Sequence, residues 1–143
     1  MRVNETNLIE VVFENVAKSC VMQLLDLLIL SAKKVIGVQC SEEIELLTNG
    51  NISDEAFNRL LGSDGDISFL INIQAMNVGD IALPSVLLRL VRYGDLYDID
   101  FNFDSNELGS ISMVHLVAEL HGYAKGIALK YSVASVYGKM EPA

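Results

Sequence analysis

The chain has 143 residues, 51% of them hydrophobic, and 19 acidic against 10 basic residues give it a net charge of −9. A chain of this length fits one domain, residues 1–143, and it is too hydrophobic to be a disordered acidic tail. The charge disfavours nucleic acid and anionic membranes as partners, because both repel an acidic protein at long range. It favours a basic partner, although acidity that serves only solubility is the other interpretation.

Nothing in the sequence predicts export or a cofactor. The most apolar run, residues 20–32, contains Gln23 and Asp26 and is shorter than the roughly 20 residues that a membrane span requires. The polar N-terminus lacks the basic and apolar regions of a signal peptide. Cys20 and Cys40 have no metal-type spacing, so buried free thiols are expected. We expect a cytoplasmic protein without a metal or other cofactor.

Residues 8–36 contain neither Gly nor Pro, and their hydrophobic residues recur at helical spacing. The positions are Ile9, Val12, Phe13, Val16, Cys20, Leu24, Leu27 and Leu28. This pattern predicts one long helix or two abutting helices. Two brief helices are expected to follow, one from Ser41 to Asn49 and one from Ser53 to Gly62, so the predicted chain is helical up to residue 62.

The hydrophobic period changes to two from Asp66, where Ile67, Phe69, Ile71 and Ile73 alternate with other residues. This alternation predicts a strand, and a turn is expected at residues 77–80. With the two strands that follow, the segment predicts a small antiparallel meander over about residues 66–104.

A hairpin is predicted from residue 86 to residue 104, with Gly94-Asp95 as a two-residue turn. Side chains alternate between the faces of a strand. The turn fixes the register, listed here as opposing pairs: Arg92 with Tyr97, Leu90 with Ile99, Leu88 with Phe101, Val86 with Phe103, Arg89 with Asp100, and Val91 with Asp98. One face is therefore apolar, while Asp98, Asp100 and Asp104 lie on the other.

A helical period returns after Asp104 and predicts a long helix from Ser110 to Tyr131 that packs on the sheet. Gly122 and Gly126 lie four residues apart in it, which either permits a close crossing by another backbone or ends the helix. A short final strand is possible at Val133–Tyr137. The fold class is thus α+β, with helices first, then the meander, then the long helix.

Two pairs of residues are candidates for metal chemistry. Asp98 and Asp100 share a strand face and could bind one divalent cation, and residues 95–101 resemble the Asp-x-Asp segment of nucleotidyltransferases. That family has a Gly-Ser pair upstream on the same unit, whereas Gly62-Ser63 lies in a different connection. His115 and Glu119 are four apart on one helix side but lack a third ligand, so an exposed ion pair is the favoured interpretation. No recognised catalytic motif occurs in the sequence.

Most of the negative charge falls between residues 54 and 107, where ten acidic residues and three arginines give a net charge of −7. The acids are Asp54, Glu55, Asp64, Asp66, Asp80, Asp95, Asp98, Asp100, Asp104 and Glu107. A concentrated field of this kind suits the steering of a basic protein partner.

Four features of the chain occur together: its size, a core without catalytic motifs, the Asp-lined strand 98–104, and the ending Tyr137-Gly138-Lys139-Met140-Glu141-Pro142. In these features the chain resembles the small acidic immunity proteins of bacterial toxin systems, including those of contact-dependent growth inhibition. The resemblance implies a non-enzymatic cytoplasmic protein that binds a toxin's C-terminal domain, often a basic nuclease, and blocks it. We expect the toxin's active or substrate-binding surface to be covered by the acidic hairpin face and nearby turns. The candidate partner-binding residues are Asp64, Asp66, Tyr93, Asp95, Tyr97, Asp98, Asp100 and Asp104, and Tyr137 is a further candidate anchor; Tyr97 could equally belong to the core.

Two alternatives stay open at this point. The first is a homodimeric structural or adaptor protein, in which residues 21–30 and the Gly122–Gly126 pair face a second copy. The second is a metal-dependent enzyme that uses Asp98 and Asp100.

Overall fold

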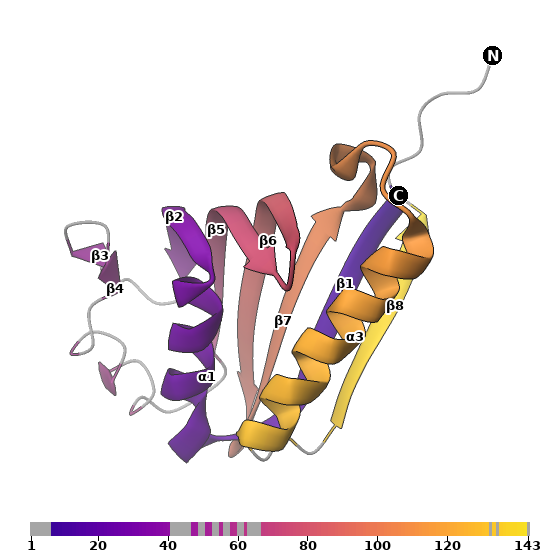
Figure 1. The fold of residues 1–143 in the computed structure, drawn as a ribbon. Coiled ribbons are helices and arrows are strands. Elements are labelled where there is room, and N and C mark those ends of the chain that lie inside the picture. Colours follow the sequence, from indigo (N-terminus) through magenta and orange to yellow (C-terminus); the bar gives the residue numbers. More distant parts are fainter. Residues whose placement is uncertain are drawn as a thin grey trace.

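The computed structural model is built on one six-stranded antiparallel sheet with the strand order β2-β5-β6-β7-β1-β8 (Figure 1). It describes residues 7–40, 47–48, 51–52, 55, 58–59, 62, 67–131, 133 and 135–142. The strands of the sheet are β1 (Asn7–Ala17), β2 (Ala32–Cys40), β5 (Ile67–Val78), β6 (Ile81–Tyr93), β7 (Leu96–Asp104) and β8 (Ser135–Pro142). The class is α+β, as predicted.

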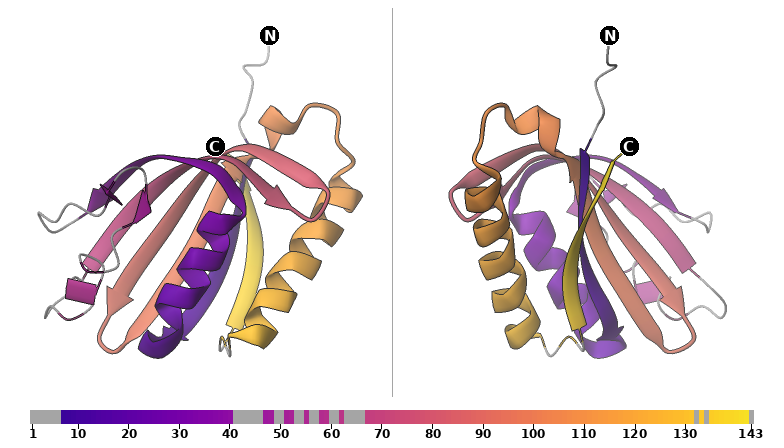
Figure 2. Two further views of the ribbon diagram at one scale, coloured as in Figure 1. Left: turned by 60° about the vertical axis from the view of Figure 1, so that its left-hand side comes forward. Right: turned by 90° about the vertical axis from the view of Figure 1, so that its right-hand side faces the viewer.

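Both long helices lie on the same face of the curved sheet (Figures 1 and 2). They are α1 (Lys18–Leu30) and α3 (Met113–Lys130), and a short 3-10 helix, η1 (Ser105–Leu108), follows β7. Between helices and sheet lies one cluster of buried hydrophobic side chains. Helix α1 contributes Val21, Leu24, Leu25 and Leu28 to it, and α3 contributes Leu116, Leu120, Ala124 and Ile127. The C-cap residue of α1 is joined to α3, because the hydroxyl groups of Ser31 and Tyr123 are 2.9 Å apart.

The prediction of helices first is wrong for residues 7–17, which form the strand β1. Ile9, Val11 and Phe13 alternate toward the core, as a strand requires. A β-bulge between Phe13 and Val16 then inserts one extra residue, so that Val16 also faces the core. The bulge places the core residues Phe13 and Val16 three residues apart, and Val12, which is buried on the opposite face, lies three residues from Ile9 and four from Val16. The same positions therefore match a helix when only the sequence is read.

Within residues 8–36, which were predicted to be helical, only α1 is a helix. The last of these residues, 32–36, begin β2 at the edge of the sheet. The chain passes from β1, next to one edge, through α1 to β2 at the opposite edge (Figure 1). Helix α1 ends at Leu30, with Ser31 as its C-cap.

The hairpin and the meander are confirmed. Strands β5, β6 and β7 are consecutive antiparallel neighbours. The pairs of β6 and β7 run from Leu87 opposite Asn102 to Tyr93 opposite Leu96, in the predicted register. Gly94 has the positive φ, 63°, that the first central position of such a turn requires. Strand β6 begins earlier than expected, at Ile81, and includes Pro84 in a part that extends beyond the pairing with β7.

Between β2 and β5 the structure describes few residues. Leu47–Thr48 and Asn51–Ile52 form the two-stranded sheet of β3 and β4, where the end of a brief helix had been predicted, while residues 41–46 lie outside the described part. Within the second predicted helix, residues 53–62, the described residues 55, 58, 59 and 62 are helical.

Helix α3 runs without a break through Gly122 and Gly126. A Cβ atom at either glycine would meet no described atom within 4 Å, so the predicted close crossing is absent from the described part of the chain. The final strand exists, but β8 begins at Ser135 and reaches Pro142, beyond the predicted 133–137. It pairs with β1 and completes the sheet.

The apolar run of residues 21–30 faces the protein's own core through its four buried residues, and is therefore not the free surface that the homodimer interpretation required. Neither α1 nor α3 has both the length and the apolarity to span a membrane; this applies to the described residues.

Candidate functional site

The face of the sheet opposite the helices carries carboxylates from two neighbouring strands. Strand alternation places Glu10 and Glu14 of β1 on this face, together with Asp98, Asp100 and Asp104 of β7. We call these five residues the acidic sheet face. No described helix covers it (Figure 2). The surface is mixed, because half-buried Leu70, Leu87 and Val91 lie on the neighbouring strands between polar residues.

An ion pair lies at the centre of this surface. Arg89 of β6 lies opposite Asp100 of β7, and its Nε and Nη2 atoms donate to Asp100 Oδ2 at 2.9 and 2.8 Å. Asp100 is only 2% exposed, whereas the Arg89 side chain is 46% exposed. The other oxygen, Asp100 Oδ1, is buried and has no hydrogen-bond partner among the described residues.

This environment raises the pKa of the Asp100 carboxyl. Burial is the main cause, since it disfavours the charged form. The hydrogen bond and charge of Arg89 oppose the rise, while the negative charges of Glu10 and Asp98 add to it. For Arg89, burial lowers the pKa, but the hydrogen bond to Asp100 and the surrounding carboxylates outweigh it and raise the pKa further.

Asp98 secures the bulge in β1. Its Oδ1 accepts a hydrogen bond from the backbone N–H of Asn15 at 3.0 Å. Asn15 has φ 56°, a left-handed conformation that asparagine tolerates better than most residues, and a bulged residue leaves ladder hydrogen bonds unmade. Asp98 therefore has a structural role in addition to its charge.

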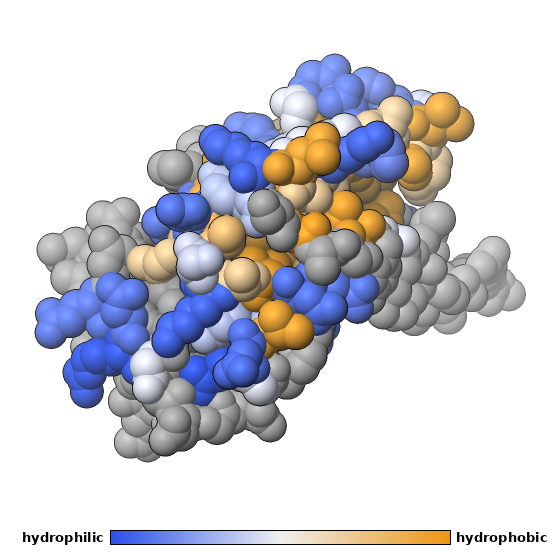
Figure 3. Space-filling view, turned by 90° about the horizontal axis from the view of Figure 1, so that it is seen from below, coloured by the Kyte–Doolittle hydropathy of each residue, from blue (hydrophilic) through white to orange (hydrophobic). Residues whose placement is uncertain are grey.

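The structure places the other predicted partner-binding residues in different environments. Asp95 is exposed in the β6–β7 turn, and Asp104 is half-buried and caps η1 by accepting from the Asn106 N–H at 2.9 Å. Tyr97 is 1% exposed and belongs to the core, the second of its two interpretations. Tyr93 ends β6, but its side chain is outside the described part, as are Asp64 and Asp66 entirely. Figure 3 views the end of the molecule that holds the β6–β7 turn, where hydrophobic residues are visible among hydrophilic ones.

Asp98 and Asp100 each have a partner within the protein. One carboxylate accepts from the Asn15 amide and the other is paired with Arg89. Among the described residues, the group of side chains able to hold a metal is a different one, composed of Asp80, His115 and Glu119. The geometry thus gives no support to the metal-dependent enzyme built on Asp98 and Asp100.

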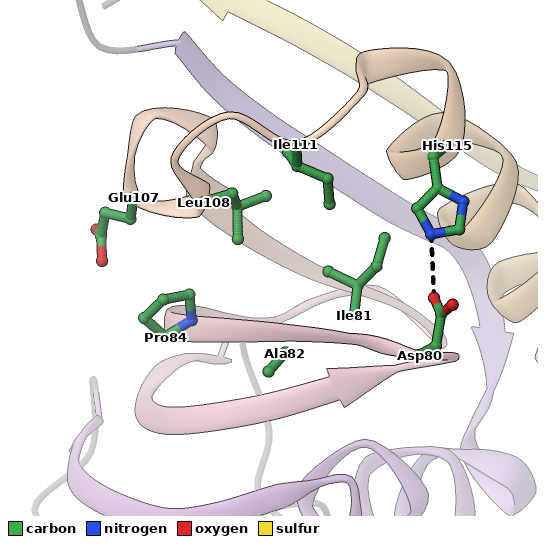
Figure 4. Close-up of a pocket in the computed structure, with 8 residues that line it drawn as sticks. All are labelled: Asp80, Ile81, Ala82, Pro84, Glu107, Leu108, Ile111 and His115. Atoms are coloured by element: carbon green, nitrogen blue, oxygen red, sulfur yellow. Dashed lines mark ion pairs between the residues drawn. The ribbon is translucent and has the colours of Figure 1, made fainter.

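A pocket of about 340 Å³ lies between the β5–β6 turn and the start of α3 (Figure 4). Its lining residues are Asp80, Ile81, Ala82, Pro84, Glu107, Leu108, Ile111 and His115. At one end His115 Nε2 is 3.2 Å from Asp80 Oδ1. Glu119 was the predicted partner of His115, whereas the ion pair that the structure shows for His115 is with Asp80, and Glu119 lies close to both.

Comparison with known proteins gives a family. Residues 7–143 match the model of the family described as PABL017 Cdi1I immunity protein. The chain belongs to this family of immunity proteins. It is also similar to a chain of the 1.75 Å crystal structure of the toxic C-terminal tip of CdiA from Pseudomonas aeruginosa in complex with its immune protein, with a TM-score of 0.84 and 28% identity over 96% of this chain and 88% of that one. No curated protein matches.

Sequence analysis of the immunity protein missed Glu10 as part of the charged surface. Glu10 lies within residues 8–36, which were predicted to be helical, whereas it pairs with Asn102 of β7 and its charge acts on Asp100. The alternation of Ile9, Val11 and Phe13 around it was the available signal.

Proposed function

We propose that this immunity protein binds and neutralises the toxic C-terminal tip of a cognate CdiA protein in the cytoplasm, as a non-enzymatic inhibitor. The observation that carries the proposal is the family match over residues 7–143, and the similarity to a chain from a complex of a CdiA toxin tip with its immune protein supports it.

The acidic sheet face and the exposed Asp95 turn are the proposed contact surface. Of the sheet's two faces, this one is free of described helices and carries the five carboxylates of the acidic sheet face, with Arg89 among them and Lys139 opposite Glu10 in the strand register. Such a surface attracts a basic domain and speeds its association. A toxin that acts on nucleic acid has a basic substrate-binding surface, so we propose that the immunity protein covers that surface.

Charge alone does not give long residence, which depends on a few well-packed, desolvated anchors. The half-buried Leu70, Leu87 and Val91 supply apolar area between the carboxylates. Tyr93 remains a candidate anchor at the end of β6, and the strand register places Tyr137 of β8 beside Val12. Tyr97 is excluded as an anchor of the folded protein by its burial.

The test is co-expression with the C-terminal domain of the CdiA protein encoded beside this chain. We expect the immunity protein to restore growth of cells that express the domain and to co-purify with it as a complex. A C-terminal domain from a different CdiA protein is the matched control and should remain toxic. Growth arrest that persists although folded immunity protein is present, with no complex recovered, would refute the proposal.

A second copy of the chain is the other candidate partner. Three hydrophobic residues of α3 are strongly exposed, Val114 at 82%, Val117 at 53% and Leu129 at 77%. Exposed apolar groups on one helix are a common feature of self-association. Sedimentation at micromolar concentration tests this candidate, and a single monomeric species that does not change with concentration would exclude it.

A further inference from the structure

The β5–β6 turn and helix α3 bring together three side chains of the types that bind metals. Asp80 comes from the turn, while His115 and Glu119 come from successive turns of the helix. Residues four apart on a helix lie on the same side, one above the other. One ligand atom from each of the three residues lies within 4.8 Å of the others. We propose that Asp80, His115 and Glu119 form a binding site for a divalent transition-metal ion, with Zn²⁺ the preferred ion.

The backbone of the turn allows this approach. Gly79 has φ 60° and lies directly against the Glu119 carboxylate, where a Cβ atom would collide with it. A glycine at this position therefore serves two purposes. It adopts the left-handed conformation and it leaves room for the carboxylate beside Asp80.

The donor set suits a transition metal. One imidazole nitrogen and two carboxylate oxygens are ligands that Zn²⁺ binds at about 2.0–2.2 Å. Two ligand atoms at that distance in a tetrahedral site are roughly 3.3 Å apart, and the atoms of His115 and Asp80 are already 3.2 Å apart. Mg²⁺ and Ca²⁺ prefer oxygen-only sites, so the histidine selects against them.

Three protein ligands leave at least one coordination position open. His115 and Asp80 also line one end of the pocket, so an ion bound here would be accessible from it (Figure 4). Their side chains are 47% and 70% exposed, which makes the site reachable without unfolding but poorly shielded from water. We therefore expect affinity in the micromolar range, below that of buried structural zinc sites.

Hydrogen bonding between His115 and Asp80 explains the same 3.2 Å distance without a metal, so the test must separate the two interpretations. Protein without a tag, stripped with a chelator, is titrated with Zn²⁺ by calorimetry and by competition with a chromophoric indicator. We expect one ion per chain. His115→Ala, Asp80→Asn and Glu119→Gln should each weaken binding at least tenfold, as measured on variants whose circular dichroism matches that of the unmodified protein.

His121→Ala is the matched control, because His121 is an exposed histidine on the same helix outside the cluster. Its affinity for Zn²⁺ should equal that of the unmodified protein. Titration with Co²⁺ gives an independent readout, since nitrogen and oxygen ligation produces no thiolate charge-transfer band. Absence of binding up to millimolar Zn²⁺, an undiminished affinity in His115→Ala, or a thiolate band that disappears in Cys20→Ser would each overturn the proposal.

Discussion

The two faces of the sheet are stabilised in different ways. On the face beneath the helices, every strand except the edge strands contributes fully buried hydrophobic side chains, such as Phe13, Ile71 and Phe101. On the opposite face, polar groups are held by specific partners, such as Arg89 with Asp100. Hydrophobic burial is large and non-directional, whereas an ion pair gains little net stability but is costly to break. We therefore expect the covered face to set the stability of the fold and the uncovered face to be more tolerant of change, except at its centre.

Substitution of Phe101 should give the largest effect. Its ring is fully buried and packs edge-on against Tyr123, with centroids 6.4 Å apart and an interplanar angle of 83°. Phe101→Ala should lower the free energy of unfolding by about 3–5 kcal/mol, because it removes apolar contacts and leaves a cavity. Urea denaturation measures the change. Asn102→Ala, one residue away on the other face, should cost less than about 1 kcal/mol; equal losses in both variants would contradict the comparison.

Disruption of the central ion pair should give the next largest effect. Arg89→Met keeps much of the apolar stem but leaves the buried Asp100 without its cation. Breaking a fully buried pair costs about 3–5 kcal/mol, and because Arg89 is about half exposed we expect a smaller loss, about 1–3 kcal/mol. The double variant Arg89→Met with Asp100→Asn should recover much of it, since no unpaired charge remains. A double variant less stable than Arg89→Met would contradict this account, because removal of the Asp100 charge would then bring no recovery.

Neutral substitutions on the uncovered face should slow toxin association without unfolding the protein. Asp95→Asn combined with Asp98→Asn removes two charges but keeps an oxygen that can accept from the Asn15 amide. We expect the association rate with the CdiA tip to fall by up to about tenfold at low salt, and the difference to shrink as salt rises. Stopped-flow fluorescence measures the association rates of the variant and of the unmodified protein at each salt concentration.

The matched control for association is Asp26→Asn with Glu55→Gln, which removes the same charge from exposed sites outside the acidic sheet face. Asp26 lies on α1, on the opposite side of the sheet (Figure 1). If the control slows association as much as the test variant does, net charge rather than this surface steers the toxin.

The smallest effect concerns pH. The raised pKa of Asp100 means that the folded state holds this proton more tightly than the unfolded state, whose carboxyl titrates near 3.8. Its contribution to stability is therefore present at low pH and is lost as pH rises from about 3.8 through the folded pKa. The stability of the unmodified protein minus that of Asp100→Asn should fall over this interval in acid-range urea titrations. A difference that rises with pH over this interval would contradict the raised pKa of Asp100.

The hairpin could be predicted to single-residue accuracy because its information is local. Gly94-Asp95 fixes the turn, and alternation over residues 96–104 then fixes which side chains share a face. The pairing of Arg89 with Asp100 followed from the same register. By contrast, the partner of Asp98 is the amide of Asn15, at a sequence separation of 83 residues, and nothing local indicates it.

Strand β1 could not be assigned correctly from the same kind of pattern. Its bulge makes its core positions resemble those of a helix, and only its pairing with β7 and β8 decides between the two structures. Similarly, the spacing of His115 and Glu119 was visible in the sequence, but Asp80 joins them only because the β5–β6 turn reaches the start of α3.

The pairing of β1 also determines when the fold can be completed during synthesis. Leu8 lies between Asp104 on one side and Glu141 on the other, both far along the chain. Contacts so distant in sequence are slow to form, because a long stretch of chain must be ordered before they are made. On the ribosome, β1 must therefore wait until β8 has emerged before it has both neighbours. Neutralisation of the toxin by newly synthesised immunity protein should therefore lag behind translation by at least this folding delay.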